Sequence, residues 1–232
     1  MVSETLSRVL ITGAGRGLGL ALANHFVHQG WEVIATCRQS SEALSELQSR
    51  HGIRVESLDI ADPASIAALA ARLHGIAIDV LLSSASIVQD DPDPTTPPNA
   101  DAFMDILRVN ALSPILVARS LLDNVTLSNR RVIANVSSRL GSIGLNDHGE
   151  QLIYGASMAA LNRLTVSLSS STRAHQITVV ALHPGWVSTG VGGADAPVTP
   201  AVSAAGLYRV IDTVCAEQSG RFYDYTGEAL DW

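Results

Sequence analysis

A glycine-rich turn between an apolar strand and a helix is the feature of this 232-residue chain that most restricts its fold. Apolar residues 9–11 lead into Thr-Gly-Ala-Gly-Arg-Gly-Leu-Gly at 12–19, and an apolar-periodic helix then continues to about residue 29. Glycines at such a turn let the backbone approach a pyrophosphate, which the positive end of the helix then binds. The order of strand, glycine turn and helix therefore predicts a dinucleotide-binding α/β fold.

Strand and helix patterns alternate along the rest of the chain, which favours a parallel sheet with helices as crossovers. The further strands are expected near residues 31–36, 54–58, 79–82, 131–136, 177–183 and 220–224. The further helices are expected near residues 41–48, 63–74, 102–108, 112–122, 151–173 and 199–216. We predict a single-domain Rossmann fold over residues 1–232, with a doubly wound parallel sheet of about seven strands and helices on both faces.

Composition excludes several classes of protein. The net charge of −7 argues against non-specific nucleic-acid binding, because the chain cannot offset phosphate repulsion. No apolar run approaches the ~18 residues that span a bilayer, and the first residues show no signal-peptide pattern. Two cysteines, Cys37 and Cys215, are too few for a disulfide framework, which favours a reduced, cytoplasmic setting.

The end of the second strand indicates the cofactor. An NAD-preferring fold places Asp or Glu about 20 residues past the glycines, on the ribose hydroxyl. Here that strand ends in Cys37-Arg38, and Arg16 lies within the glycine turn. A guanidinium suits the extra phosphate of NADP, because it is planar, permanently charged and able to bind in bidentate fashion. The sequence therefore predicts NADP(H), with solvated surface charges as the alternative for both arginines.

Four further motifs follow in order: Asn110 before a helix, Ser137-Ser138 at a strand end, Tyr154 at the start of a long helix, and Pro-Gly-x-Val-x-Thr at 184–189. With the glycine turn they resemble the short-chain dehydrogenase/reductase family over essentially the whole chain. Local strings such as Ala-Thr-Cys-Arg at 35–38, Ser-Ser-Arg-Leu-Gly-Ser-Ile at 137–143 and His-Pro-Gly-Trp-Val at 183–187 are similar to its C-factor and sniffer-type carbonyl reductases.

The resemblance implies roles for these residues. Tyr154 would give a proton to a substrate carbonyl, Ser138 would bond the developing oxyanion, and Asn110 would hold a water of the proton relay. A helix N-cap is the structural alternative for Asn110, and a loop or capping carboxylate is the alternative for Asp59. The implied cofactor-binding residues are Gly13, Gly15, Arg16, Gly17, Leu18, Gly19, Arg38, Asp59, Ile60, Ser84, Ala85, Tyr154, Pro184, Gly185, Val187 and Thr189.

The chain departs from the family at two places. The lysine that normally follows the tyrosine by four residues is Met158, and the chain contains no lysine at all. Relatives have Asn-Asn-Ala-Gly where residues 83–86 read Ser-Ser-Ala-Ser. A thioether neither lowers the pKa of a phenol nor binds ribose hydroxyls. We therefore expect Tyr154 to keep a pKa near ~10, which affects alcohol oxidation more than carbonyl reduction.

Three function classes remain open. The first is an NADP(H)-dependent reductase that acts on a carbonyl or enone of a small molecule. The second is a non-redox dehydratase, cyclase or isomerase that uses Ser138 and Tyr154. The third is a catalytically silent NADP-binding regulatory protein. By resemblance, the helices near 111–125 and 151–173 pair copies into a homodimer or homotetramer. No metal, membrane or nucleic-acid partner is expected.

Other patterns are weaker. The proline-rich loop 88–100 is expected to be exposed, and residues 190–197 occupy the position of a substrate lid. His148 and Glu150 favour a solvated loop, with substrate contact as the alternative. His25 and His28 lie three residues apart without an evident third ligand, so a metal site is not expected there.

Overall fold

The structure, a computed structural model, describes residues 6–88, 99–145 and 151–232. Parts of the proline-rich loop, as well as His148 and Glu150, lie outside these residues. Within the described ranges, no helix combines the length and apolar character needed to cross a membrane. The same ranges contain no cluster of three or more His, Cys, Asp or Glu side chains that could hold a metal ion.

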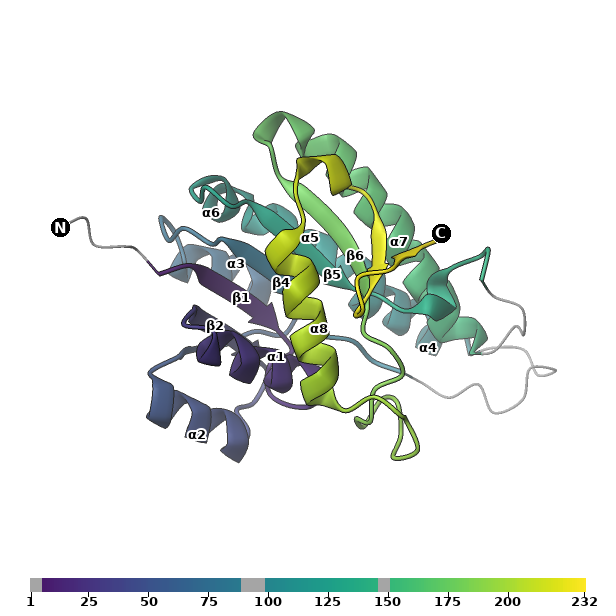
Figure 1. Ribbon diagram of the computed structural model, residues 1–232, viewed down its shortest axis with the longest axis horizontal. Helices are drawn as coiled ribbons and strands as arrows, with labels where there is room; N and C mark the ends of the chain where they lie inside the picture. Colours follow the sequence, from purple (N-terminus) through teal and green to yellow (C-terminus); the bar gives the residue numbers. More distant parts are fainter. Residues whose placement is uncertain (1–5, 89–98, 146–150) are drawn as a thin grey trace.

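Strands and helices alternate as the sequence predicts (Figure 1). The strands are β1 Arg8–Thr12, β2 Glu32–Cys37, β3 Arg54–Ser57, β4 Val80–Ser83, β5 Val132–Val136, β6 Thr178–His183, β7 Phe222–Asp224 and β8 Ala229–Leu230. The α-helices are α1 Gly17–His28, α2 Glu42–His51, α3 Pro63–Arg72, α4 Ala100–Leu107, α5 Ser113–Ser120, α6 Leu122–Thr126, α7 Leu152–Thr172 and α8 Pro200–Thr213. A π-helix, Arg108–Leu112, joins α4 to α5, and a 3-10 turn, Arg139–Gly141, follows β5.

The described strands form one sheet in the order β3-β2-β1-β4-β5-β6-β7-β8. All neighbours pair in parallel except β7 and β8, which are antiparallel. The predicted doubly wound α/β fold is confirmed, with the short β8 as a strand beyond the seven expected. Chain order reverses between β1 and β4, and ligands of such sheets bind outside the carboxyl ends of the strands at this switch point.

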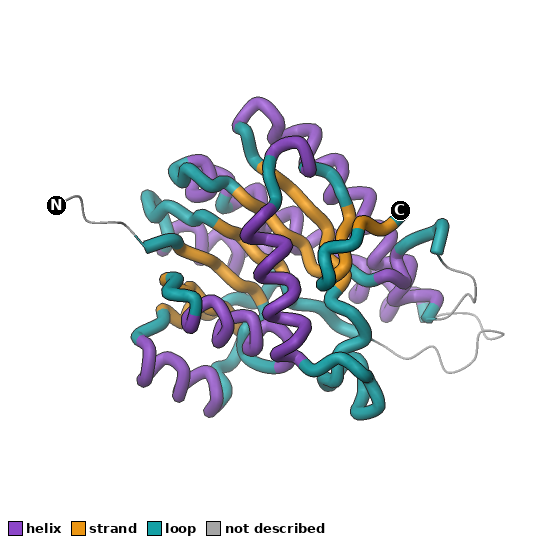
Figure 2. The backbone as a smooth tube through the Cα atoms, in the orientation of Figure 1, coloured by secondary structure: helices purple, strands orange, loops and turns teal. Residues whose placement is uncertain are grey.

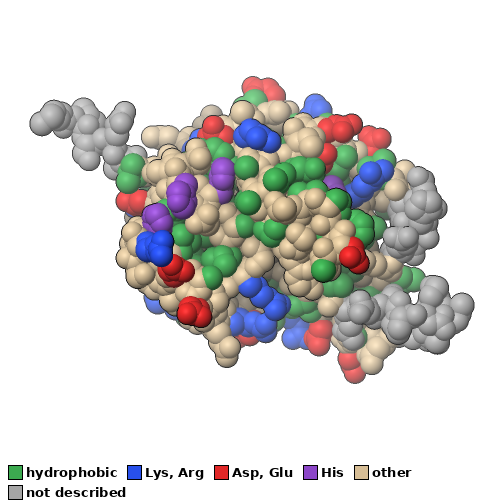
Figure 3. Space-filling model, turned by 60° about the horizontal axis from the view of Figure 1, so that its bottom comes forward, with side chains coloured by type: hydrophobic (Ala, Val, Ile, Leu, Met, Phe, Trp, Pro, Cys, Tyr) green, Lys and Arg blue, Asp and Glu red, His purple; other side chains and the backbone are tan. Residues whose placement is uncertain are grey.

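Helices cover both faces of the sheet, as the ribbon and the tube show (Figures 1 and 2). One core packs α1, α2 and α8 against alternate strand residues such as Val9, Ile11 and Leu82. The other core packs α3, α5, α6 and α7 against the intervening strand residues on the opposite face of the sheet, such as Leu10 and Leu81. A central parallel strand is apolar on both sides for this reason, which explains the continuous apolar runs in the sequence. Charges of both signs are interspersed on the face in Figure 3.

The region expected as one helix at 112–122 is more broken than predicted. Pro114 has no N–H to donate to the carbonyl of Asn110, four residues earlier, so regular α-helical bonding cannot continue through this point. The chain passes through the π-helix instead, and Ser113 Oγ donates to the Arg108 carbonyl at 2.7 Å. Asn110 lies inside that π-helix, so the alternative of an N-cap is wrong.

Candidate active site

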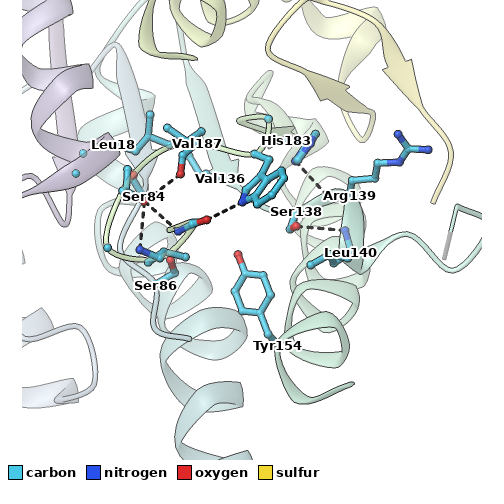
Figure 4. A pocket seen from close by; sticks show the side chains of 18 of the residues that line it. Leu18, Ser84, Ser86, Val136, Ser138, Arg139, Leu140, Tyr154, His183 and Val187 are labelled. Atoms are coloured by element: carbon cyan, nitrogen blue, oxygen red, sulfur yellow. Dashed lines mark hydrogen bonds between the residues drawn. The ribbon is translucent and has the colours of Figure 1, made fainter. Parts of the chain in front are cut away.

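A cavity of about 880 Å³ opens at the carboxyl ends of β1, β4, β5 and β6 (Figure 4). Its size is typical of a site for a cofactor with a small substrate. The lining residues are Arg16, Gly17, Leu18, Gly19, Ser84, Ser86, Val136, Ser138, Arg139, Leu140, Leu145, Gln151, Tyr154, His183, Gly185, Trp186, Val187, Thr189, Gly190, Val191 and Gly192. Parallel strands bring their following loops to one edge, which is why motifs far apart in sequence meet here.

The glycine turn forms one wall and leaves the start of α1 uncapped. Helices α2, α3, α4 and α8 each begin with a side chain that accepts a backbone N–H, whereas Arg16 before α1 provides no such cap. The first turn of α1 also lacks an acidic residue. Unsatisfied N–H groups and the positive end of the helix dipole suit an anion at this position.

The opposite side of the turn is packed against the end of β4. Gly13 has φ +72°, and a Cβ there would lie 2.7 Å from the Cα of Ala85, so no side chain fits. Thr12 Oγ1 accepts the N–H groups of Ser84 at 3.1 Å and Ala85 at 3.3 Å. Strands β1 and β4, which flank the switch point, are therefore fixed together at the edge of the cavity.

Ser138 follows β5, and the turn after it is fixed to α7. Its Oγ accepts the N–H of Leu140 at 3.2 Å. A Cβ at Gly141 would lie 2.6 Å from the backbone carbon of Met158, so only glycine permits this contact. Asn162 accepts a hydrogen bond from Ser137 Oγ at 2.6 Å and donates to the Gly141 carbonyl at 3.2 Å. The packing of this turn sets where Ser138 stands relative to the helix that carries Tyr154.

Tyr154 lies in the first turn of α7 and points its hydroxyl into the cavity (Figure 4). Burial raises the pKa of this phenol to about 12, and hydrogen bonding to Ser138 opposes the rise. The expected pKa near ~10 was therefore too low, because the sequence did not reveal how strongly the site is desolvated. At neutral pH the group is a phenol, which can donate a proton but is a very poor base.

Met158 is 1% exposed and does not line the cavity. Its sulfur lies 4.0 Å from Ser137 Oγ, beneath the turn that carries Ser138. The side chain at the family's lysine position therefore serves as packing between α7 and that turn. Within the described part of the chain, no other cation replaces the lysine beside Tyr154, and burial accordingly dominates the pKa of the tyrosine.

Asn110 is buried, and its side chain is fully used for tertiary contacts. Its Oδ1 accepts the Ile87 N–H at 2.9 Å, and its Nδ2 donates to the Ile87 carbonyl at 2.8 Å. The Nδ2 also donates to Ser157 Oγ at 3.1 Å, and Ser157 in turn donates to the Tyr154 carbonyl at 2.7 Å. Asn110 thus ties the segment after β4 to the turn of α7 that bears Tyr154, although it does not line the cavity.

The predicted cofactor-binding residues divide into two groups. Those in the cavity wall are Arg16, Gly17, Leu18, Gly19, Ser84, Tyr154, Gly185, Val187 and Thr189. Those outside it are Gly13, Gly15, Arg38, Asp59, Ile60, Ala85 and Pro184. Arg38 is exposed just after the end of β2. This strand end lies beside the glycine turn, since a Cβ at Gly15 would lie 3.2 Å from Cys37 Cβ. Asp59 Oδ1 accepts the Ala61 N–H at 3.0 Å, as a loop carboxylate does.

Two buried polar atoms of β4 and β5 lack hydrogen-bond partners in the described part of the chain. Ser83 and Asn135 are register partners on β4 and β5. Within the described residues, neither Ser83 Oγ nor Asn135 Oδ1 has a hydrogen-bond partner, although both atoms are buried. An unpaired buried polar group costs about 1–3 kcal/mol. The sheet beneath the cavity is therefore held by packing and backbone bonds, with Thr12 linking β1 to the end of β4.

Residues 190–197, expected as a lid, form a turn over the glycine loop. Trp186 Nε1 donates to the Gly192 carbonyl at 2.6 Å, and Thr189 Oγ1 accepts the Gly192 N–H at 3.3 Å. A Cβ at Gly17 would lie 3.5 Å from Thr189 Cγ2, so the residue just before this segment reaches the start of α1. Trp186 and residues 190–192 thereby form part of the cavity wall, together with the glycine turn.

Sequence reasoning missed several wall residues, among them Ser86, Arg139, Gln151, His183 and Trp186. Only their position in the sequence could have identified them, since each adjoins a recognised motif at a strand end or helix start. His183 ends β6 with Nδ1 accepting the Arg139 N–H at 3.2 Å. Burial lowers the pKa of His183 to about 4; nearby Asp224 opposes this shift and Arg139 adds to it. The imidazole is therefore neutral at physiological pH.

Comparisons with known proteins agree with this geometry. The family model described as short chain dehydrogenase matches residues 7–197. C-signal of Myxococcus xanthus is 41% identical over 124 residues, which cover 53% of this chain and 75% of that protein. The structure of carbonyl reductase Sniffer of D. melanogaster is 31% identical, with a TM-score of 0.92 over 98% of this chain and 100% of that one. An NADPH-bound carbonyl reductase from chicken fatty liver is 32% identical, with a TM-score of 0.89 over 98% and 99%. The predicted resemblance is confirmed.

The low pKa of His183 predicts a pH dependence of stability. Its folded pKa of about 4 lies below the ordinary 6.5, so the unfolded chain takes up the proton first as pH falls. The stabilisation is complete above pH ~6.5 and is lost between ~6.5 and ~4, by up to about 3 kcal/mol. Urea unfolding across this range should show a smaller loss for His183→Asn than for the native chain. Parallel pH profiles for the two proteins would contradict this prediction.

Proposed function

This chain belongs to the short-chain dehydrogenase family, and we propose that it is an NADP(H)-dependent reductase acting on the carbonyl or enone of a small molecule. One observation carries the proposal: Ser138 and Tyr154 line the same cavity as the uncapped start of α1. A dinucleotide phosphate bound at that helix and a carbonyl bound at the two hydroxyls would share one cavity. The NADP-containing structures of similar proteins support this choice of cofactor.

The residues present fit the cofactor. The uncapped start of α1 would accept the pyrophosphate, and exposed Arg38 and Arg16 would bind the additional phosphate. The wall at Gly185, Val187 and Thr189 would hold the nicotinamide end. The contacts to the ribose, adenine and nicotinamide stay predictions, and they involve Ser84, Ala85, Asp59, Ile60 and Pro184. When bound, NADPH supplies hydride to the carbonyl carbon.

The protein's own groups would handle the proton and the developing negative charge. Ser138 Oγ, held by the Leu140 N–H, would donate to the carbonyl oxygen and stabilise its charge. Tyr154 would deliver a proton to that oxygen, because its hydroxyl faces the cavity and stays protonated. Asn110 would act as a positioning residue, since its bonds to Ile87 and Ser157 fix the backbone behind Tyr154.

The raised pKa of Tyr154 gives the reaction a preferred direction. Reduction uses the phenol as an acid, which is the form present at neutral pH. Alcohol oxidation uses the phenolate, which at a pKa of about 12 amounts to about one part in 10⁵ at pH 7. We therefore propose that the chain works as a reductase, with oxidation strongly disfavoured near neutral pH.

We further propose that the protein is cytoplasmic and forms a homodimer or homotetramer through α5 and α7. The two free cysteines support the cytoplasmic setting. The assembly is supported by two exposed leucines, Leu112 just before α5 and Leu152 in α7. Exposed large apolar side chains on neighbouring elements favour association. Sedimentation velocity should report a species of at least twice 24.4 kDa; a monomer throughout the micromolar range would reject the assembly.

Cofactor preference is the first test of the proposed function. Fluorescence titration should show tighter binding of NADPH than of NADH, and Arg38→Ala should reduce that difference. The ion pair with the additional phosphate is the cause, so the NADH affinity should change little. Arg173→Ala removes an equivalent exposed charge at the far end of α7 and should leave the preference intact. Equal affinities in the native chain would reject NADP as the cofactor.

Position 158 is the second test. Met158→Lys restores a cation one helical turn from Tyr154, so the pKa of the phenol should fall and hydride transfer should accelerate. The gain should reach part of the ~10²–10⁴-fold typical of acid–base assistance. It should be larger for alcohol oxidation than for ketone reduction at neutral pH. The free energy of unfolding should decrease, because the side chain at 158 is buried and an unpaired ammonium is costly there.

Met158→Leu is the matched control, since it keeps an apolar side chain of similar volume and adds no charge. It should leave both rates close to those of the native chain. A rate increase in Met158→Leu would show that packing, not charge, limits the reaction. If the native and lysine proteins both bind NADPH yet oxidise none of it with aldehydes, ketones, quinones or enones, the reductase proposal fails.

A further inference from the structure

His183 is a polar group in the cavity wall that the proposed mechanism does not use. It ends β6 and lines the main cavity together with Ser138 and Tyr154. It also lines a second cavity of about 290 Å³, which adjoins the first at Arg139, Leu145 and His183. The imidazole therefore stands at the junction of the two spaces, where the part of a substrate beyond its carbonyl would extend.

The backbone fixes which nitrogen of the ring can donate. The Arg139 N–H donates to Nδ1 at 3.2 Å, so Nδ1 carries no proton and the neutral ring holds its proton on Nε2. Within the described part of the chain, Nε2 has no hydrogen-bond partner. Burial keeps the imidazole neutral by lowering its pKa to about 4. The ring thus offers one uncharged N–H donor of fixed orientation.

This donor lies close to the group that would bind the reacting carbonyl. The N–H of Arg139 bonds the histidine, and the N–H of the next residue, Leu140, bonds Ser138 Oγ. Figure 4 shows both bonds on the same short turn, with the Arg139 guanidinium directed away from Tyr154. Because His183 and Ser138 also line the same cavity, one substrate can contact Ser138 with its carbonyl and the imidazole with another atom.

Charges around the second cavity indicate what kind of substrate atom could lie near the imidazole. Asp224 on β7, Glu228 before β8 and Asp231 after it line that cavity, and Arg139 is the basic residue among its lining residues. Three carboxylates against one guanidinium make the surroundings negative. An anionic group on a substrate would be repelled there, whereas an uncharged oxygen would meet no such repulsion.

We propose that His183 is a specificity-determining residue whose Nε2–H binds an uncharged acceptor oxygen located a few bonds from the reacting carbonyl. The preferred substrates are then oxygenated neutral ketones, such as ketones with an adjacent ether, ester or second carbonyl oxygen. This inference rests on the proposed reductase function and assigns a substrate class to the same site.

Two matched ketones test the donor. Methoxyacetone and pentan-2-one have the same chain length, but only the former has an acceptor oxygen two bonds from the carbonyl carbon. The ratio of their kcat/KM values should fall about three- to tenfold in His183→Leu, which removes the donor. The intrinsic activation of the carbonyl by the ether is the same in both proteins and cancels in the comparison. His183→Gln, which keeps an N–H, should retain a higher ratio than His183→Leu.

Two further measurements support the kinetic test. His183→Asn keeps an acceptor for the Arg139 N–H but ends short of Nε2, so it should behave like His183→Leu and replaces it if that variant does not fold. Nitrogen-15 NMR of the native protein should find the imidazole proton on Nε2. Methyl acetoacetate should be reduced with a higher kcat/KM than the acetoacetate anion.

The outcomes separate this inference from the proposed function. If the native chain reduces ketones with NADPH and the ratio is unchanged in the leucine and asparagine variants, the role of His183 is rejected and the reductase function stands. A proton on Nδ1, or a preference for the anion, also rejects it. If NADPH binds but no ketone is reduced, the proposed function fails and the role of His183 falls with it.

Discussion

The parallel register of β1, β4, β5 and β6 is the constraint on which the rest of the structure depends. Parallel strands end at one edge of the sheet, so the glycine turn, the serines after β4, Ser138 and His183 all reach the same side. The reversal of chain order between β1 and β4 separates the crossover helices to opposite faces and leaves that edge open. The cavity is a consequence of this topology, and side chains only shape it.

Close backbone contacts then set the geometry at the edge. Gly13 lies against Ala85 and Gly141 lies against Met158, each at a distance that excludes a Cβ. Side-chain amides reinforce these contacts: Asn162 holds the turn after Ser138, and Asn110 holds the segment after β4. The two hydroxyls proposed to act on a carbonyl are thus positioned by residues outside the cavity. A substitution at any of these contacts would move Ser138 or Tyr154 without touching either.

The buried methionine explains why the chemistry of this site differs from the family pattern. A lysine at position 158 would place a charge next to Tyr154, whereas the thioether fills space beneath the Ser138 turn. Desolvation then dominates the phenol, and its pKa rises instead of falling. The same environment keeps His183 neutral. Tyr154 and His183 are therefore both uncharged hydrogen-bond donors, which suits the binding of an oxygen and its protonation by Tyr154 better than proton abstraction.

The sequence by itself determined the order of the elements, the glycine turn and the motif residues Ser138, Tyr154 and Asn110. Local patterns suffice for these because hydrophobic periodicity and turn chemistry act over a few residues. It also showed that no lysine in the chain can take the place of the missing one.

Only the tertiary structure decided how those residues are used. The extra strand β8 and the second cavity depend on contacts between distant segments. The pKa of Tyr154 depends on burial, and the position of the proton on His183 depends on one backbone N–H from the loop after another strand. Desolvation is a property of the packed surroundings, and for that reason no local pattern in the sequence reveals it.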